Sequence, residues 1–341
     1  MAEIEIRSYK PGDEEALVRT WNAIFPSQDG SAPRTLEEWR WAYLQNPGGG
    51  PEIGVGLVDG EIVGQYACFP MRALKEGAEI SLGQLVDAFV LPQHRRAGGR
   101  PGLIVHMAEH LHDSYGGPRA SARQPGHELF YGLPVPIWRM AQRYLGGEIV
   151  RDLDVLFREI AVPSFRPLPL PEGWTVERVP AGDPSLLPVL DQVWNKVAPE
   201  VAFGVVRDAA YLQWRYLHHP RVAYDLLLAR DPQGNPRGLG VFRSGAYVVP
   251  QGGLIVDWIV PREDEEADLA LLSEMERRAG AKGLPVLVAV FAQNDPRFLR
   301  FQRTGFLVGP PTHFLGMKTY KLHVRWLRDR WFFTLGDTDL V

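Results

Sequence analysis

Arginine and glycine residues crowd one short stretch of the sequence, and together these residue types could bind a phosphate group. Residues 83–103 read GQLVDAFVLPQHRRAGGRPGL. Gly98 and Gly99 would let the backbone approach an anion closely. A helix start after a basic loop adds free backbone N–H groups and the positive end of the helix dipole. The stretch therefore predicts an anion cradle, although it contains neither a Walker sequence nor G-x-G-x-x-G.

A strand and a helix are expected to hold this loop in place. The apolar run over residues 85–90 is interrupted by Asp87 and is typical of a buried strand, which Pro92 ends. Pro101 is expected at the first position of a helix that continues through residues 103–109. The order strand, basic glycine loop and helix is thus predicted from local patterns alone.

The same stretch resembles the acyl-CoA signature of the GNAT acetyltransferases, V-x-P-x-x-R-x-x-G-x-G/A. Val90, Pro92, Arg95 and Gly98 fill its first four places, and Arg100 stands where the family has Gly or Ala. The resemblance implies that the loop amides hold the pyrophosphate of coenzyme A and that the preceding strand pairs with the pantetheine arm. We expect Arg100 to pair with the pyrophosphate as a cation. The implied contact residues are Phe89, Val90, Leu91, Arg95, Arg96, Ala97, Gly98, Gly99, Arg100, Pro101 and Gly102.

Similar segments recur in the same order about 170 residues apart. The matching pairs are residues 6–13 and 176–183, Trp21-Asn22 and Trp194-Asn195, residues 41–47 and 214–220, and residues 83–87 and 253–257. A repeat of this length indicates a duplicated domain and not a solenoid unit. The proline-spaced segment 163–171 separates the copies. We therefore expect domains over 1–160 and 174–341, joined by a linker over 161–173.

Each copy reads as strand, one or two helices, three strands, helix, strand, helix and strand, which is the order of a GNAT fold. The resemblance implies an α/β fold with two tandem GNAT-like domains, each a central mixed β-sheet flanked by helices. The copies differ after Val260-Pro261, where Arg262-Glu263-Asp264-Glu265-Glu266 replaces the basic loop. Acidic residues in a first helical turn stabilise the helix by roughly 0.3–1 kcal/mol each, but they would repel a pyrophosphate. We expect the second copy to hold no acyl-CoA there and to form a wall of the acceptor cleft, or simply to cap its own helix.

Three side chains are candidates for catalysis. Asp87 is the candidate general base, because a carboxylate that interrupts an apolar strand is poorly solvated and holds a proton more readily. Many GNAT enzymes use a tyrosine four residues before a Gly-Phe pair to protonate the leaving thiolate, but counting back from Gly146 gives Gln142. Tyr144 and Tyr131 are the nearest alternatives. Asp257 occupies the place of Asp87 in the second copy, which also allows a shared structural role.

Composition narrows the classes of function. The net charge of −4 over 341 residues argues against nucleic-acid binding, and neither a signal core nor a membrane-length apolar run is present. The single cysteine, Cys68, is expected to be a core residue and excludes a disulfide, so a cytoplasmic setting is predicted. His106, His110 and His112 lie on one expected helix without a metalloprotease pattern, and no metal is predicted. The oligomeric state stays open.

These observations favour an N-acyltransferase that moves an acetyl or other short acyl group directly from acyl-CoA to a primary amine of a small molecule. A non-enzymatic acyl-CoA or metabolite-binding protein is one alternative, given the missing tyrosine and Arg100. A Fem-like aminoacyl transferase is another, although tRNA binding needs a basic surface. The last residues, 336–339, follow an aromatic segment over 331–333 that is expected to be a strand. They could reach an acceptor cleft, but an acidic, loose terminal turn is the expectation.

Overall fold

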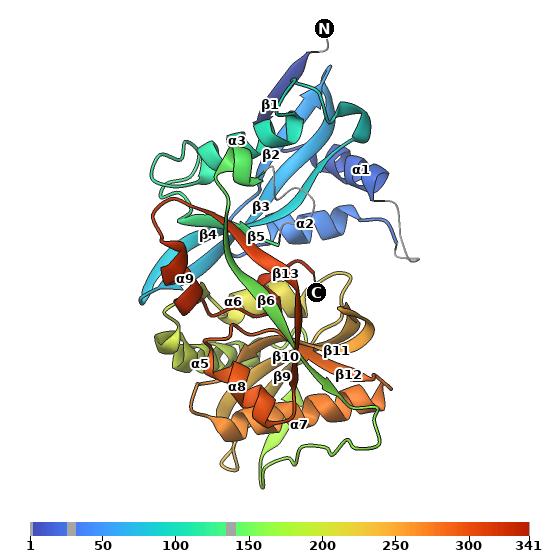
Figure 1. The fold of residues 1–341 in the computed structure, drawn as a ribbon, viewed down its shortest axis with the longest axis vertical. Helices are drawn as coiled ribbons and strands as arrows, with labels where there is room; N and C mark the ends of the chain where they lie inside the picture. The colour runs from blue at the N-terminus through green and yellow to red at the C-terminus, as the bar shows by residue number, and fades with distance from the viewer. Residues whose placement is uncertain (1–2, 26–31, 134–140, 341) are drawn as a thin grey trace. The chain divides into compact units, whose positions relative to one another are not determined.

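A computed structural model describes residues 3–25, 32–133 and 141–340 and divides into two compact units (Figure 1). The first unit comprises Met1–Ala73, Ile80–Arg151 and Leu315–Trp326. The second comprises Leu74–Glu79, Asp152–Phe314 and Leu327–Val341. Neither unit is continuous in sequence, unlike the predicted pieces 1–160 and 174–341, because a late segment of the chain packs into the first unit.

The first unit is a mixed β-sheet with helices on both faces. Its elements are β1 (Ile4–Ser8), α1 (Glu14–Ile24), α2 (Leu36–Leu44), β2 (Glu52–Val58), β3 (Glu61–Lys75), β4 (Ala78–Val90), α3 (Leu103–Tyr115) and β5 (Leu129–Gly132). The strand order is β1-β2-β3-β4-β5, with the end of β13 (Leu307–Thr319) antiparallel to β5. Figure 1 shows α3 on one side of these strands and α1 and α2 on the other.

Local sequence explains how this sheet forms. Asp59 and Gly60 join β2 to β3 in a two-residue hairpin with positive φ at both positions, as the Asp-Gly pair predicts. Gly56 of β2 lets α3 approach closely, since a Cβ there would lie 2.8 Å from the sulfur of Met107. Thr35 caps α2 in a capping box with Glu38.

The second unit repeats the same order of elements. They are β7 (Thr175–Arg178), α5 (Leu187–Val197), β8 (Phe203–Val205), α6 (Ala209–Leu212), β9 (Asp225–Arg230), β10 (Pro236–Tyr247), β11 (Val249–Ile259), α7 (Glu265–Ala281), β12 (Val286–Ala289) and α8 (Pro296–Arg303). Its strand order is β6-β12-β11-β10-β9-β7, where β6 spans Glu148–Glu159. The chain passes between the units within β3, β4, β6, β13 and α9 (Val324–Arg330). The predicted α/β fold with two similar domains is confirmed.

Two expectations about local structure were wrong. Helix α3 begins at Leu103 with Gly102 as its N-cap, so Pro101 lies before the helix and not at its first position. Residues 331–333 form no strand, and Trp331 makes only an isolated bridge with Phe203. The terminal residues Trp331–Thr338 are buried, because their side chains and backbone bond to the second unit.

None of the described helices combines the length and the apolar character that crossing a bilayer requires.

The buried imidazole of His112 makes the stability of the first unit depend on pH. Its ring stacks on Phe130 with centroids 4.7 Å apart, and burial, with a smaller effect from Lys318, lowers the pKa of His112 to about 3. In the unfolded chain the group titrates near 6.5. Between these values only the unfolded state binds the proton, so stability falls as the pH is lowered, by at most about 1.4 kcal/mol per pH unit from this group.

We therefore expect the difference in unfolding free energy between pH 7 and pH 5 to shrink in a His112→Phe variant, which keeps the stacking on Phe130. Urea unfolding at both pH values measures this difference. His323, which is exposed, provides the control variant His323→Gln. An unchanged pH dependence in His112→Phe would show that the imidazole does not cause it.

Candidate functional site

The basic loop after β4 is a succession of tight turns. A 3-10 turn covers Pro92–His94, and the N–H of Ala97 donates to the carbonyl of His94 at 2.9 Å. Gly98 and Gly99 follow with φ of 78° and 77°, a conformation that other residues rarely adopt. That these two glycines let the backbone approach a phosphate stays a prediction.

The loop presents positive charge and backbone donors to solvent. Its exposed arginines are Arg95, Arg96 and Arg100. Gly102 precedes α3 with φ of 106°, and a Cβ there would lie 2.9 Å from the carbonyl oxygen of Arg95, so only glycine fits. No side chain caps α3. The first N–H groups of this helix and the positive end of its dipole therefore remain suited to an anion.

The second unit caps its corresponding helix with its own side chain. The carboxylate of Asp264 accepts a hydrogen bond from the N–H of Ala267 at 3.1 Å, and two acidic residues, Glu265 and Glu266, follow. A hollow of about 780 Å³ lies here. Its charged lining residues are Lys196, Asp231, Arg237, Glu263, Asp264, Glu265 and Glu266. This excess of carboxylates opposes a diphosphate.

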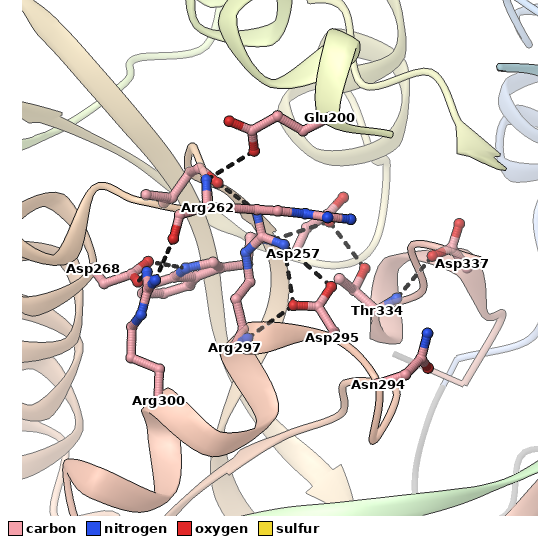
Figure 2. A network of polar contacts seen from close by, with 12 residues as sticks. Glu200, Asp257, Arg262, Asp268, Asn294, Asp295, Arg297, Arg300, Thr334 and Asp337 are labelled. Atoms are coloured by element: carbon pink, nitrogen blue, oxygen red, sulfur yellow. Dashed lines mark hydrogen bonds and ion pairs between the residues drawn. The ribbon is translucent and has the colours of Figure 1, made fainter. Parts of the chain in front are cut away.

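An arginine of the second unit also binds the backbone in this region. Arg300 of α8 donates to the carbonyl of Arg262 and pairs with Asp268, which in turn accepts from the indole N–H of Trp258 at 2.7 Å. Figure 2 shows Arg300 beside Arg262 and Asp268. In the second unit, side chains of the protein thus form the hydrogen bonds at this end of the sheet.

In the first unit, strands β4 and β5 pair only over a short distance. Their parallel register joins Gly83 to Phe130 and Gln84 to Tyr131. Strand β4 continues to Val90, whereas β5 ends at Gly132. Within the described residues, the last part of β4 therefore has no partner on the β5 side. Its backbone groups are placed where an extended ligand could hydrogen-bond to them.

Asp87 lies on this unpaired part of β4 and contacts two donors. Its φ is 49°, and its Oδ2 accepts from Arg34 Nη1 at 2.5 Å and from the Tyr43 hydroxyl at 2.6 Å. Gln65 donates to the Tyr43 oxygen at 3.2 Å. Burial, together with the charge of Asp87, raises the pKa of Tyr43 well above its ordinary value, so the phenol stays a donor. The three side chains of Arg34, Tyr43 and Asp87 form what we call the Arg–Tyr–Asp cluster.

Contacts with Asn22 and Trp21 hold Arg34 in place. Asn22 accepts from the N–H of Arg34 at 2.9 Å and donates to its carbonyl at 3.0 Å. The guanidinium lies 4.8 Å from the ring centroid of Trp21, a cation–π contact. Sequence reasoning did not identify Arg34 or Tyr43. The repeat could have done so, because both have a counterpart of the same type 173 residues later, Arg207 and Tyr216.

The two candidate tyrosines lie in different surroundings. Tyr131 is on β5 and is 1% exposed. Tyr144 is 42% exposed in a π-helical turn over Ala141–Leu145, with the guanidinium of Arg143 5.5 Å from its ring centroid. Tyr131 sits where β4 and β5 separate, whereas Tyr144 is open to solvent. Their roles as proton donors stay predictions.

Cys68 is part of a buried polar network that sequence reasoning also missed. Glu52, Cys68 and His127 each place one atom within 4.8 Å of the others, a spacing at which three ligands can hold a metal. Here they contact one another directly, with Glu52 Oε2 2.5 Å from His127 Nε2, and Arg123 pairs with Glu52 Oε1 at 2.7 Å. Burial, then Glu52, raises the pKa of the Cys68 thiol well above its ordinary value. The thiol is therefore poorly suited to nucleophilic attack.

Comparison with known proteins agrees with this geometry. Residues 5–131 match the family model described as an acetyltransferase (GNAT) domain. No curated protein sequence matches the chain. The match covers residues 5–131, so the first unit carries the sequence resemblance to the GNAT acetyltransferases.

Solved structures share the fold over nearly the whole chain, although sequence identity is low. A probable N-acyltransferase from Enterococcus faecalis V583 is 17% identical with a TM-score of 0.68, covering 95% of this chain and 74% of that chain. A GCN5-related N-acetyltransferase from Anabaena variabilis is 13% identical with a TM-score of 0.66, covering 96% and 74%. The N-myristoyltransferase of Saccharomyces cerevisiae, solved with bound myristoyl-CoA, is 13% identical with a TM-score of 0.57, covering 93% and 82%.

The Arg–Tyr–Asp cluster should contribute measurably to stability. Tyr43→Phe removes a hydroxyl that serves both Asp87 and Gln65 and leaves these buried groups short of a partner. We expect a loss of about 1–3 kcal/mol in the free energy of unfolding, measured by urea titration. The matched control is Tyr66→Phe, at a buried tyrosine on β3, and it should lower the free energy of unfolding by less. Equal losses would mean that the cluster adds nothing specific.

Proposed function

We propose that this protein is an acyltransferase that moves an acetyl or other short acyl group from acyl-CoA directly to the primary amine of a small molecule, in the first unit. The observation that carries the proposal is the exposed basic loop before the uncapped start of α3, within residues matched by an acetyltransferase family. The loop amides and Arg95, Arg96 and Arg100 are suited to the diphosphate of coenzyme A.

The unpaired end of β4 supplies the next part of the proposed site. Residues from Asp87 to Val90 offer backbone groups to a pantetheine arm, which would extend the sheet on this edge. In the transfer, the neutral amine nitrogen forms a bond to the thioester carbonyl carbon, and the carbon–sulfur bond breaks. The nitrogen loses one proton and the departing sulfur receives one. A base and a donor of protons are therefore both needed.

The structure supports a positioning role for Asp87 more strongly than the role of a base. Its Oδ2 is already held by Arg34 and Tyr43. The equivalent Asp257 makes similar contacts in a unit without a basic loop. We infer that Asp87 orients Arg34 and Tyr43 beside the acyl group. Tyr131 and Tyr144 are the proposed donors to the thiolate.

Binding of acetyl-CoA tests the proposal that the first unit, and not the second, holds the acyl donor. A variant with Arg95→Ala and Gly98→Ala should bind acetyl-CoA roughly 10- to 100-fold more weakly by calorimetric titration, because a charge-assisted phosphate contact and the loop conformation are lost. The matched change in the second unit, Glu263→Gln with Glu265→Gln, should leave the dissociation constant within about twofold. Equal weakening in both variants would refute the proposed location.

Turnover separates an enzyme from a binding protein. Release of free coenzyme A thiol from acetyl-CoA should depend on an added primary amine, with the acetylated amine detected by mass spectrometry. Tight acetyl-CoA binding without any amine-dependent release would instead favour the non-enzymatic alternative.

The variant Asp87→Asn distinguishes a base from a positioning residue. For a positioning role we expect the KM for the amine to rise about tenfold or more while the bell-shaped pH profile of kcat keeps its limbs. Loss of the acidic limb together with a fall in kcat of roughly 100-fold or more, at unchanged KM, would assign the base to Asp87. Initial rates from pH 5 to 9 provide both readouts.

A further inference from the structure

The Arg–Tyr–Asp cluster occurs twice in the chain, once in each unit. In both units the arginine precedes the second helix, the tyrosine lies at the end of that helical segment, and the aspartate lies on the strand before the third helix. The two sets are Arg34, Tyr43 and Asp87, and Arg207, Tyr216 and Asp257. In each, the tyrosine hydroxyl and the guanidinium contact the same aspartate oxygen, Oδ2.

In the second unit the cluster is closed by a further carboxylate. Arg207 Nε lies 3.4 Å from Asp257 Oδ2, and Arg207 Nη2 lies 2.6 Å from Asp337 Oδ2. Asp337 belongs to the buried terminal turn of the chain. The hydroxyl of Thr334, in the same turn, donates to Asp257 Oδ1 at 2.9 Å, and the backbone N–H of Thr334 donates to Asp337 Oδ2 at 2.9 Å. Figure 2 shows Thr334 between Asp257 and Asp337.

This turn excludes solvent from the second cluster. Arg207 and Asp257 are both 0% exposed, and Tyr216 is 2% exposed. The ring of Phe332 covers the guanidinium at 5.1 Å. A single guanidinium there bridges two carboxylates, one from the sheet and one from a separate segment of the chain.

In the first unit the equivalent guanidinium, that of Arg34, pairs with one carboxylate among the described residues. Arg34 pairs with Asp87 through Nη1, and its side chain is 18% exposed. Among the described residues, no second carboxylate pairs with it. Glu38 is near enough to act on Arg34 electrostatically, but its carboxylate accepts the N–H of Thr35 at 2.6 Å in the capping box of α2. Within residues 3–25, 32–133 and 141–340, no carboxylate of the first unit takes the position that Asp337 fills in the second.

We propose that Arg34 binds a carboxylate of the acyl acceptor in the position equivalent to that of Asp337 on Arg207, so that the acceptor is an amino acid. This inference rests on the proposed function and names the substrate class of the same site. The second unit shows that one guanidinium of this cluster can pair with two carboxylates. The proposed function gives the acceptor a primary amine, and a carboxylate bound to Arg34 makes that acceptor an amino acid. Arg34 is a specificity residue in this scheme, and Trp21 holds its planar group in place.

The test measures binding independently of turnover. The protein is saturated with coenzyme A, and each of the twenty common amino acids is titrated against its own carboxamide, which has nearly the same shape without the negative charge. Trp21 beside Arg34 provides an intrinsic fluorescence signal, with calorimetry as the second readout. We expect at least one amino acid to bind about tenfold or more tightly than its carboxamide, the loss that a charge-assisted contact predicts.

Variants at Arg34 then assign the preference. In Arg34→Gln the acid and the carboxamide should bind equally, and Arg34→Lys should retain part of the preference, because lysine keeps the charge but loses the planar fork. Arg19→Gln, an exposed arginine on α1, is the matched control and should behave as wild type. Arg19→Gln should also leave coenzyme A binding unchanged.

The outcomes separate this inference from the proposed function. If no amino acid binds better than its carboxamide, or if the preference survives in Arg34→Gln, the carboxylate site is refuted even when amines are acetylated. If the preference depends on Arg34 but no amine is acetylated, the carboxylate site stands and the proposed transfer to an amine is wrong. The comparison in the wild-type protein needs no variant, so a folding defect in Arg34→Gln cannot hide the result.

Discussion

A buried guanidinium requires a carboxylate beside it, and both units of this protein meet that requirement with an aspartate on a central strand. Removing an arginine from water costs several kcal/mol unless its charge is paired and its N–H groups are bonded. In the second unit Arg207 is paired with Asp257 and Asp337 and lies against two aromatic rings. In the first unit Arg34 is paired with Asp87, and 18% of its side chain is exposed. The same arginine–aspartate pair is thus fully buried in the second unit and partly exposed in the first.

The helix starts differ between the units in a parallel way. Each helix that follows the central strand leaves N–H groups that need acceptors. Helix α7 finds one in its own Asp264, with further acidic residues in its first turn. Helix α3 has a glycine at that position and no side-chain cap, so its acceptor must come from solvent or from a ligand. In both comparisons the second unit supplies from its own chain a partner that the described part of the first unit lacks.

Much of this architecture could be predicted from the sequence, because the signals were either local or repeated. The glycines of the turns, the Asp-Gly hairpin and the matching Trp segments can each be recognised from the order of residues alone. Arg34 was not, since a lone arginine before a helix has no distinctive pattern, and its importance comes from Asp87, 53 residues away. The buried terminal turn was also missed. Its acidic composition is typical of a loose chain end, and only the partner Arg207, 130 residues earlier, explains its burial.

The way the chain is shared between the units has a consequence for biosynthesis. Strand β5 pairs with Gly316–Thr319, and residues 315–326 belong to the first unit. A ribosome that has released only the amino-terminal half has therefore not yet supplied every strand that this unit needs. The first unit can reach its final form only after residues 315–326 have emerged, so the side of β5 that pairs with β13 stays unpaired until then.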